Sequence, residues 1–175
     1  PITLETEINN LSSNLYGLGY DRDGKLTNLN KASKTNIITY LNNFKTLTDS
    51  VNIKDAFIIN FGIEFEITTY TNISDEQVIL DCITELKNYF AIDKWQINQP
   101  IILSEIYNLI GNVEGVQSVN NVVFTNKAGE DIGYSKFRYD FEQATKNGIT
   151  YPSMDPSIFE IKYPDSDIRG KIKQY

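Results

Sequence analysis

The sequence predicts an α+β fold: small mixed sheets with helices packed on one face, followed by an extended C-terminal arm. Residues 59–67 alternate between apolar and polar side chains, which is typical of a strand with one buried face. Residues 79–90 change to helical spacing, with an apolar stripe of Ile79, Ile83, Leu86 and Phe90. Prolines then recur through residues 151–175, which disfavours a long helix there.

Composition limits the chemistry that the chain can perform. The 175 residues are 41% hydrophobic, enough to bury the core of one domain or of two small ones. There is no histidine, and Cys82 is the single cysteine, so nucleophilic triads and Cys/His zinc sites cannot form within one chain. We expect Cys82 to be a small buried hydrophobe on its helix. We therefore expect no enzyme activity, no cofactor and no metal. Because no long apolar run is present, we also expect no membrane association.

Charge is unevenly distributed. The net charge is −7, which disfavours binding to nucleic acid. The last ten residues are basic, because Arg169, Lys171 and Lys173 oppose only Asp167. A basic end on an acidic body can suit an acidic protein partner, and a solvated end is the alternative.

Residues 1–52 form the first predicted unit, an irregular segment and a helix. We expect a turn at Asp21–Gly24, where a calcium loop is disfavoured because its spacing is wrong. Thr35 can cap a helix that runs to about Thr48. The chain begins with Pro1 rather than methionine, so we expect it to be a piece of a longer polypeptide.

Residues 53–126 form the second predicted unit, an α+β core. Ser74 and Gln77 have the spacing of a capping box at the start of the helix that follows the long strand. A short strand or extended link with Trp95 and Ile97, a helix over 102–110 and a strand over 116–125 complete the unit.

Residues 127–175 form the third predicted unit, a β-rich segment and an interaction arm. Alternating aromatic residues at 137–141 suggest a strand or sheet edge, and packing of these rings over the main core is the favoured alternative. A second short strand lies between prolines, which confines it to a sheet edge or a separate patch. We expect this arm to dock on a neighbouring subunit, with closure of its own domain as the alternative. The candidate subunit interface is Phe159, Ile161, Tyr163, Arg169, Lys171 and Lys173.

Three stretches carry a resemblance to a known family. TDSVNIKDAFIINFGIEFEI (Thr48 to Ile67) and ILSEIYNLIGNVEGVQSV (Ile102 to Val119) resemble the baseplate J-like family. YPSMDPSIFEIKYPDSDIRGKI (Tyr151 to Ile172) is similar to the C-terminal portion of baseplate wedge subunits of T-even type contractile-tail phages. The resemblance spans about residues 35–175, and residues 1–34 match the family less clearly.

The resemblance implies a structural role in the virion. Such a subunit is assembled in the host cytoplasm, pairs with itself as a homodimer or ring, and binds other baseplate wedge proteins around the tail hub. No catalytic residue is implied. The alternative function is an acidic α+β module that binds nucleic acid or protein. An enzyme that uses Glu64 and Glu66 is disfavoured, and a solvated or interfacial sheet face is the favoured interpretation of these residues. A metal held by Asp165 and Asp167 is also disfavoured, and a turn is the favoured interpretation there.

Overall fold

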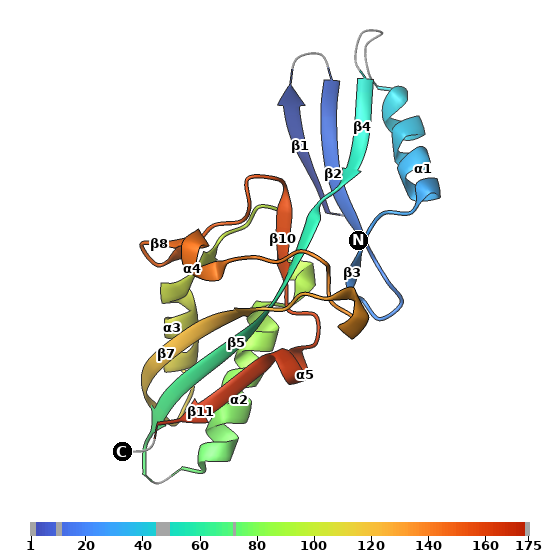
Figure 1. Ribbon diagram of the computed structural model, residues 1–175. Helices are drawn as coiled ribbons and strands as arrows, with labels where there is room; N and C mark the ends of the chain where they lie inside the picture. The colour runs from blue at the N-terminus through green and yellow to red at the C-terminus, as the bar shows by residue number, and fades with distance from the viewer. Residues whose placement is uncertain (1–2, 10–11, 45–49, 72, 174–175) are drawn as a thin grey trace.

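The computed structural model describes residues 3–9, 12–44, 50–71 and 73–173 (Figure 1). Within these ranges the chain forms three small sheets and five α-helices, which confirms the predicted α+β class. Figure 1 shows an N-terminal sheet with one helix standing on a larger body, and one continuous stretch of chain running from the first into the second.

The N-terminal sheet has four strands. They are β1 (Thr3–Asn9), β2 (Ser12–Tyr20), β3 (Leu26–Thr27) and β4 (Ser50–Asp55). Strand β2 pairs antiparallel with β1 and β3, and parallel with β4. The prediction of irregular structure over residues 1–34 was wrong for the described strands, whereas the hairpin or turn predicted with it is present between β2 and β3. Strand formation depends on cross-strand neighbours more than on local propensity, so these polar strands gave little signal.

Helix α1 (Lys31–Asn42) begins four residues before the predicted cap at Thr35. Asn30 caps it instead, because its side-chain oxygen accepts a hydrogen bond from the Ser33 N–H at 2.7 Å. The predicted turn at Asp21–Gly24 is confirmed. The Asp21 carboxylate accepts backbone N–H bonds from Asp23 and Lys25, each at 2.9 Å, which closes the turn.

Strand β5 (Phe57–Thr69) is the centre of the larger body. Its inward side chains are each at most 2% exposed, which confirms the alternation predicted for Ile59, Phe61, Ile63, Phe65 and Ile67. Helix α2 (Asp75–Tyr89) packs on it but buries Val78, Cys82 and Leu86. The buried stripe thus lies one residue away from Ile79 and Ile83, which flank it half-buried, and the prediction of a buried Cys82 is confirmed.

Three strands pair with β5. Strand β7 (Val116–Asn126) is antiparallel to it, whereas β10 (Ser157–Glu160) and β11 (Ile168–Ile172) run parallel to successive stretches of it. Helices α2 and α3 (Leu103–Gly111) cover one face of the sheet made by β7, β5 and β11 (Figure 1). Within the described residues, no helix of comparable length covers the opposite face of that sheet.

Short elements complete the body. They are β6 (Ile101–Ile102), β8 (Thr145–Lys146), β9 (Ile149–Thr150), η1 (Ile92–Lys94), η2 (Glu130–Ile132), α4 (Phe141–Ala144) and α5 (Pro164–Asp167). The segment predicted as a short strand or extended link is a 3₁₀ turn over Ile92–Lys94 followed by a linking stretch in which Trp95 is extended, and the Trp95 and Ile97 side chains are buried. The strand predicted at 137–141 is a loop that ends in α4, and Phe141 is buried over the core.

The C-terminal arm is part of the body and does not extend from it. Among the described strands, β10 pairs with β5 alone and stands at the end of the strand order, so the predicted position at a sheet edge is confirmed, although all four of its residues are buried. The prolines flank β10 and do not interrupt it. Pro164 occupies the first position of α5, where its missing N–H has no helical partner to lose.

Close packing beneath β11 gives a stability prediction. A Cβ added at Gly170 would lie 2.5 Å from the Phe65 ring and 2.9 Å from Ile79. We expect Gly170→Ala to lower the free energy of unfolding by about 1–3 kcal/mol through overpacking, measured by urea denaturation.

Gly111→Ala is the matched control for this prediction. Its added Cβ would lie 3.8 Å from Val119, an ordinary contact, at the end of α3. Alanine is the better helix former by roughly 0.5–1 kcal/mol, so this variant should be as stable as the wild type or more stable. Equal losses in both variants would contradict the assigned packing of Gly170.

Candidate interaction surface

The predicted apolar anchors lie in the core of this same chain. Phe159 is 1% exposed and Ile161 is 8% exposed. The Phe159 ring lies 5.7 Å from Phe141 and 6.0 Å from Phe61, measured between ring centroids. In this fold neither side chain can anchor a neighbouring subunit, so this part of the candidate interface is corrected. Their contacts match the alternative, in which the segment closes its own domain.

Tyr163 is also held within the chain, although it is only half-buried. Its ring centroid lies 5.3 Å from that of Tyr134, and the Lys25 ammonium lies 4.0 Å above its ring. Its hydroxyl donates to the Gly133 carbonyl oxygen at 3.4 Å. Tyr163 therefore connects the N-terminal turn to the loop that contains η2.

The basic residues of the candidate interface are exposed: Arg169 and Lys171 lie on β11, and Lys173 directly follows it. The register with β5 places Arg169 opposite Glu64 and Lys171 opposite Glu66. Arg169 also donates from Nε to the Ser166 carbonyl oxygen at 3.1 Å, and the Lys173 N–H donates to the Ile67 carbonyl oxygen at 2.9 Å. The three cations thus line one edge of the sheet.

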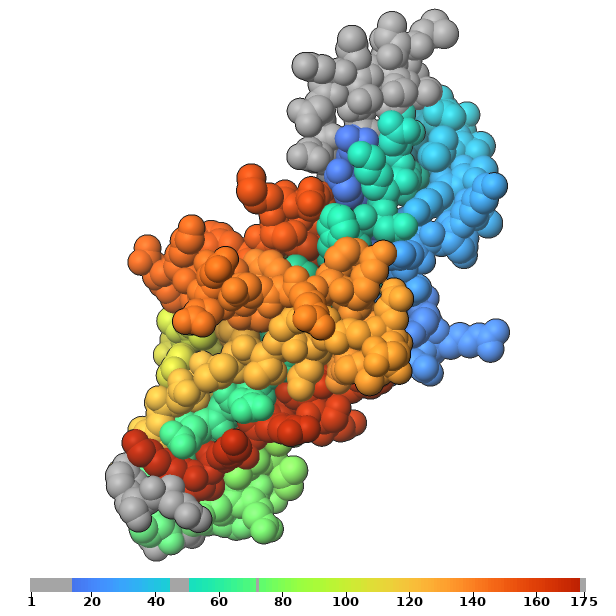
Figure 2. All heavy atoms as spheres, in the orientation of Figure 1, coloured from blue at the N-terminus to red at the C-terminus, as the bar shows by residue number. Residues whose placement is uncertain are grey.

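The face of the β7, β5 and β11 sheet that α2 and α3 leave open is a continuous polar surface. Figure 2 shows these strands side by side, β7 in yellow-orange, β5 in green and β11 in red. Glu64 and Glu66 lie in its middle row, half-buried, as predicted for the polar side of β5. On β7 the register adds Val123, which is 44% exposed, and Asn121. We define these residues, with Arg169 and Lys171, as the open face.

A buried polar network joins the N-terminal sheet to the body. The Glu160 carboxylate, 3% exposed, accepts hydrogen bonds from the Leu26 N–H and from Asn60 Nδ2, each at 2.7 Å. The Asn60 side-chain oxygen accepts the Ser135 N–H at 2.7 Å. Burial raises the pKa of Glu160, against the two hydrogen bonds, which lower it. Sequence reasoning missed this network, and its one signal is a glutamate inside an otherwise apolar strand.

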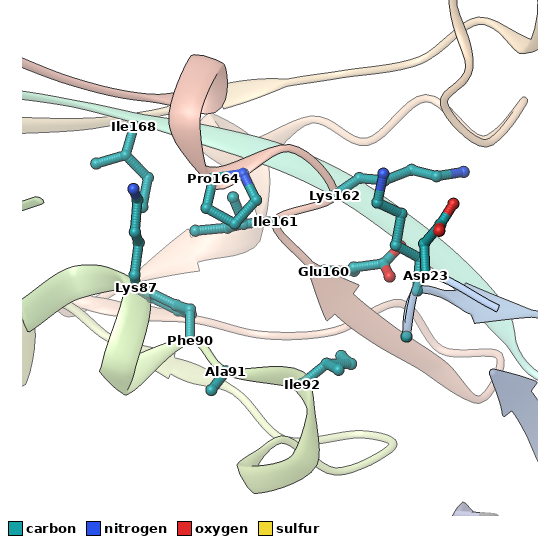
Figure 3. A pocket seen from close by; sticks show the side chains of 12 residues that line it. Asp23, Lys87, Phe90, Ala91, Ile92, Glu160, Ile161, Lys162, Pro164 and Ile168 are labelled. Atoms are coloured by element: carbon teal, nitrogen blue, oxygen red, sulfur yellow. The ribbon is translucent and has the colours of Figure 1, made fainter. Parts of the chain in front are cut away.

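A pocket of about 210 Å³ lies beside this network (Figure 3). Its walls come from the N-terminal turn, the end of α2, and the segment from β10 to β11. Phe90, Ile92 and Ile161 provide apolar surface, and Lys87 and Lys162 lie at opposite sides in Figure 3. The pocket is below the roughly 300–1,000 Å³ typical of small-molecule sites.

Asp165 and Asp167, which were considered as metal ligands, bind different partners. Asp165 pairs with the Lys87 ammonium at 2.5 Å, whereas the buried Asp167 accepts hydrogen bonds from the Tyr134 hydroxyl and the Tyr163 N–H. Among the described residues, no group of three or more His, Cys, Asp or Glu side chains is placed to hold a metal ion. No helix among the residues that the structure describes is long and apolar enough to cross a bilayer.

The aromatic residues of β5 do not form a platform for bases. Phe61 is fully buried and Phe65 is 2% exposed, both on the side that α2 covers. Stacking of unpaired bases requires exposed rings. These two rings are therefore not available to stack on bases.

Comparisons with known proteins place the fold. No protein-family model matches the chain, and no curated protein matches it. Among solved structures, the chain is similar to a chain in the cryo-EM structure of the anti-feeding prophage baseplate, determined with six-fold symmetry. The likeness covers 85% of this chain and 29% of that chain, with a TM-score of 0.52 and 12% identity. The two chains share a fold, and this chain spans less than a third of the length of the other.

Proposed function

We propose that this chain is a structural, non-enzymatic component of a contractile-tail baseplate. The observation that carries the proposal is the shared fold, which extends over 85% of the chain and includes both the N-terminal region and the body by its extent. The resemblance of residues 48–67 and 102–119 to the baseplate J-like family, and of residues 151–172 to baseplate wedge subunits, supports the same role. The Lys87 pair of Asp165 and the hydrogen bonds that Glu160 accepts within the chain support a role in packing.

We further propose that the chain is a wedge subunit of the baseplate in the virion. In this role the protein is assembled in the host cytoplasm, pairs with copies of itself and contacts other wedge proteins. The open face supports a protein contact, because it combines opposite charges with the exposed Val123 on a rigid sheet. No nucleic acid, membrane, cofactor or small-molecule substrate enters this role.

Immunogold labelling of particles tests the proposed location. Particles with contractile tails are purified from a culture that produces the protein, and an antibody raised against the purified chain is applied. We expect gold at the end of the tail distal to the head, and no gold when the antibody has been absorbed with the purified chain. Label on the head or along the sheath, or protein that remains in the soluble fraction without any label on tails, would overturn the baseplate role.

A further inference from the structure

The outer edge of β11 has unpaired backbone groups. Within the described residues, β5 is the one strand that pairs with β11. The Lys173 N–H donates to β5, so by alternation the backbone groups of Arg169 and Lys171 also face β5. Gly170 and Ile172 therefore direct their N–H and C=O groups away from the sheet. An edge of this kind is a template for one more strand.

The side chains of β11 determine which strand can be added. On the open face, Arg169 and Lys171 already lie opposite Glu64 and Glu66 on one side. Carboxylates on an added strand would place acidic groups on the other side of the same cations. Opposite charges that face each other in neighbouring strands stabilise the pairing of those strands.

The helix-facing side of β11 selects for apolar residues. Gly170 has no side chain there and lies against Phe65 and Ile79, and Ile172 is half-buried against the core. Alternate residues of an added strand would point to this side. A complementary strand therefore alternates acidic and apolar residues.

A second copy of β11 does not meet these requirements. An antiparallel pair of β11 strands centred on Gly170 would place Arg169 opposite Lys171 of the other copy, and like charges directly opposite are destabilising. Basic residues on an exposed edge are also a known protection against association of identical strands. Self-pairing of this protein would then use a different surface.

We propose that β11 receives an extended segment of another protein as an additional strand, and that this segment alternates acidic and apolar residues. The proposal rests on the baseplate role, because it identifies the chemistry of one neighbouring subunit. The added strand would extend the β7, β5 and β11 sheet and continue the open face into the partner.

Amide hydrogen exchange followed by NMR tests the proposal on the full chain. The probe is a short blocked peptide in which glutamate and valine alternate. At saturating peptide, we expect the Gly170 and Ile172 amides to exchange at least tenfold more slowly. The Arg169 and Lys171 amides already bond to β5, so their exchange should change little.

Charge reversal tests whether the basic side chains of β11 determine which peptide binds. We expect the double variant Arg169→Glu, Lys171→Glu to bind the acidic peptide roughly tenfold more weakly, equivalent to about 1.4 kcal/mol, and to prefer a peptide in which lysine replaces glutamate. The matched control, Arg138→Glu with Lys146→Glu, reverses one arginine and one lysine that are exposed outside β11. It should bind like the wild type.

Three results would overturn the proposal. They are no protection of Gly170 and Ile172 at millimolar peptide, equal affinity of wild type and double variant, and protection that rises with protein concentration alone. The last would assign the edge to a second copy. Failure here with gold at the tail tip overturns the strand addition alone. Gold elsewhere on the particle, or none on it, overturns the baseplate role whether or not the peptide binds.

Discussion

Phe61→Ala should be the most destabilising single truncation in the body. Phe61 is 0% exposed, and four other rings surround it, with centroids 5.3–6.0 Å away: Phe90, Phe124, Phe141 and Phe159. These rings come from α2, β7, α4 and β10 or their ends, so the lost ring leaves a cavity that all four elements border. Burial of a phenylalanine is worth about 3–5 kcal/mol on truncation to alanine, which is a large part of the 5–15 kcal/mol typical of a whole domain.

Thermal and urea unfolding of the purified chain measure this loss. At this chain length we expect the melting temperature to fall on the order of 10 °C. Phe44→Ala is the matched control, because it removes the same ring from a position that is 72% exposed. It should change the free energy of unfolding by less than about 0.5 kcal/mol. A small effect at Phe61, or losses of similar size at both positions, would show that β5 is not the centre of the core.

The elements that could be predicted from sequence are the strands and helices with one buried face and one face exposed to solvent. Strand β5 and helices α2 and α3 have this property, so their periods appear directly in the order of apolar residues. Strand β10 does not, because both of its faces are buried and it has only four residues. A short apolar run between prolines reads equally well as an isolated strand, so its position beside β5 could not be deduced.

The candidate interface could likewise be predicted only in part. Exposure of Arg169 and Lys171 could be predicted, because charged side chains are rarely buried without a partner. Burial of Phe159 and Ile161 depends on a parallel pairing between residues about a hundred positions apart, which no local pattern reveals. Glu160 was missed for the opposite reason. A buried carboxylate is uncommon, and its two donors, from Leu26 and Asn60, come from distant segments.

Glu160→Ala is expected to have the second largest effect, because it removes the acceptor that ties the N-terminal sheet to β5. The Leu26 N–H and Asn60 Nδ2 would both be left without this partner in a buried site. Each buried unpaired donor costs about 1–3 kcal/mol, so we expect a loss of roughly 2–5 kcal/mol in urea unfolding. The matched control is Glu142→Ala, which truncates an exposed glutamate and should have little effect.

The pH dependence of stability distinguishes loss of the acceptor from loss of the charge. Because burial raises the pKa of Glu160 above its ordinary value of about 4.3, the native state binds more protons than the unfolded state between that value and the native pKa. The contribution of Glu160 to the free energy of unfolding is therefore fully present below about pH 4.3 and falls as pH rises through the native pKa. Glu160→Gln keeps an acceptor oxygen and cannot ionise, so it should lose less stability than Glu160→Ala. The difference in unfolding free energy, wild type minus Glu160→Gln, should decrease as pH rises across this window. A difference that stays constant or increases with pH would mean that the native pKa of Glu160 is not raised, and that its hydrogen bonds outweigh its burial.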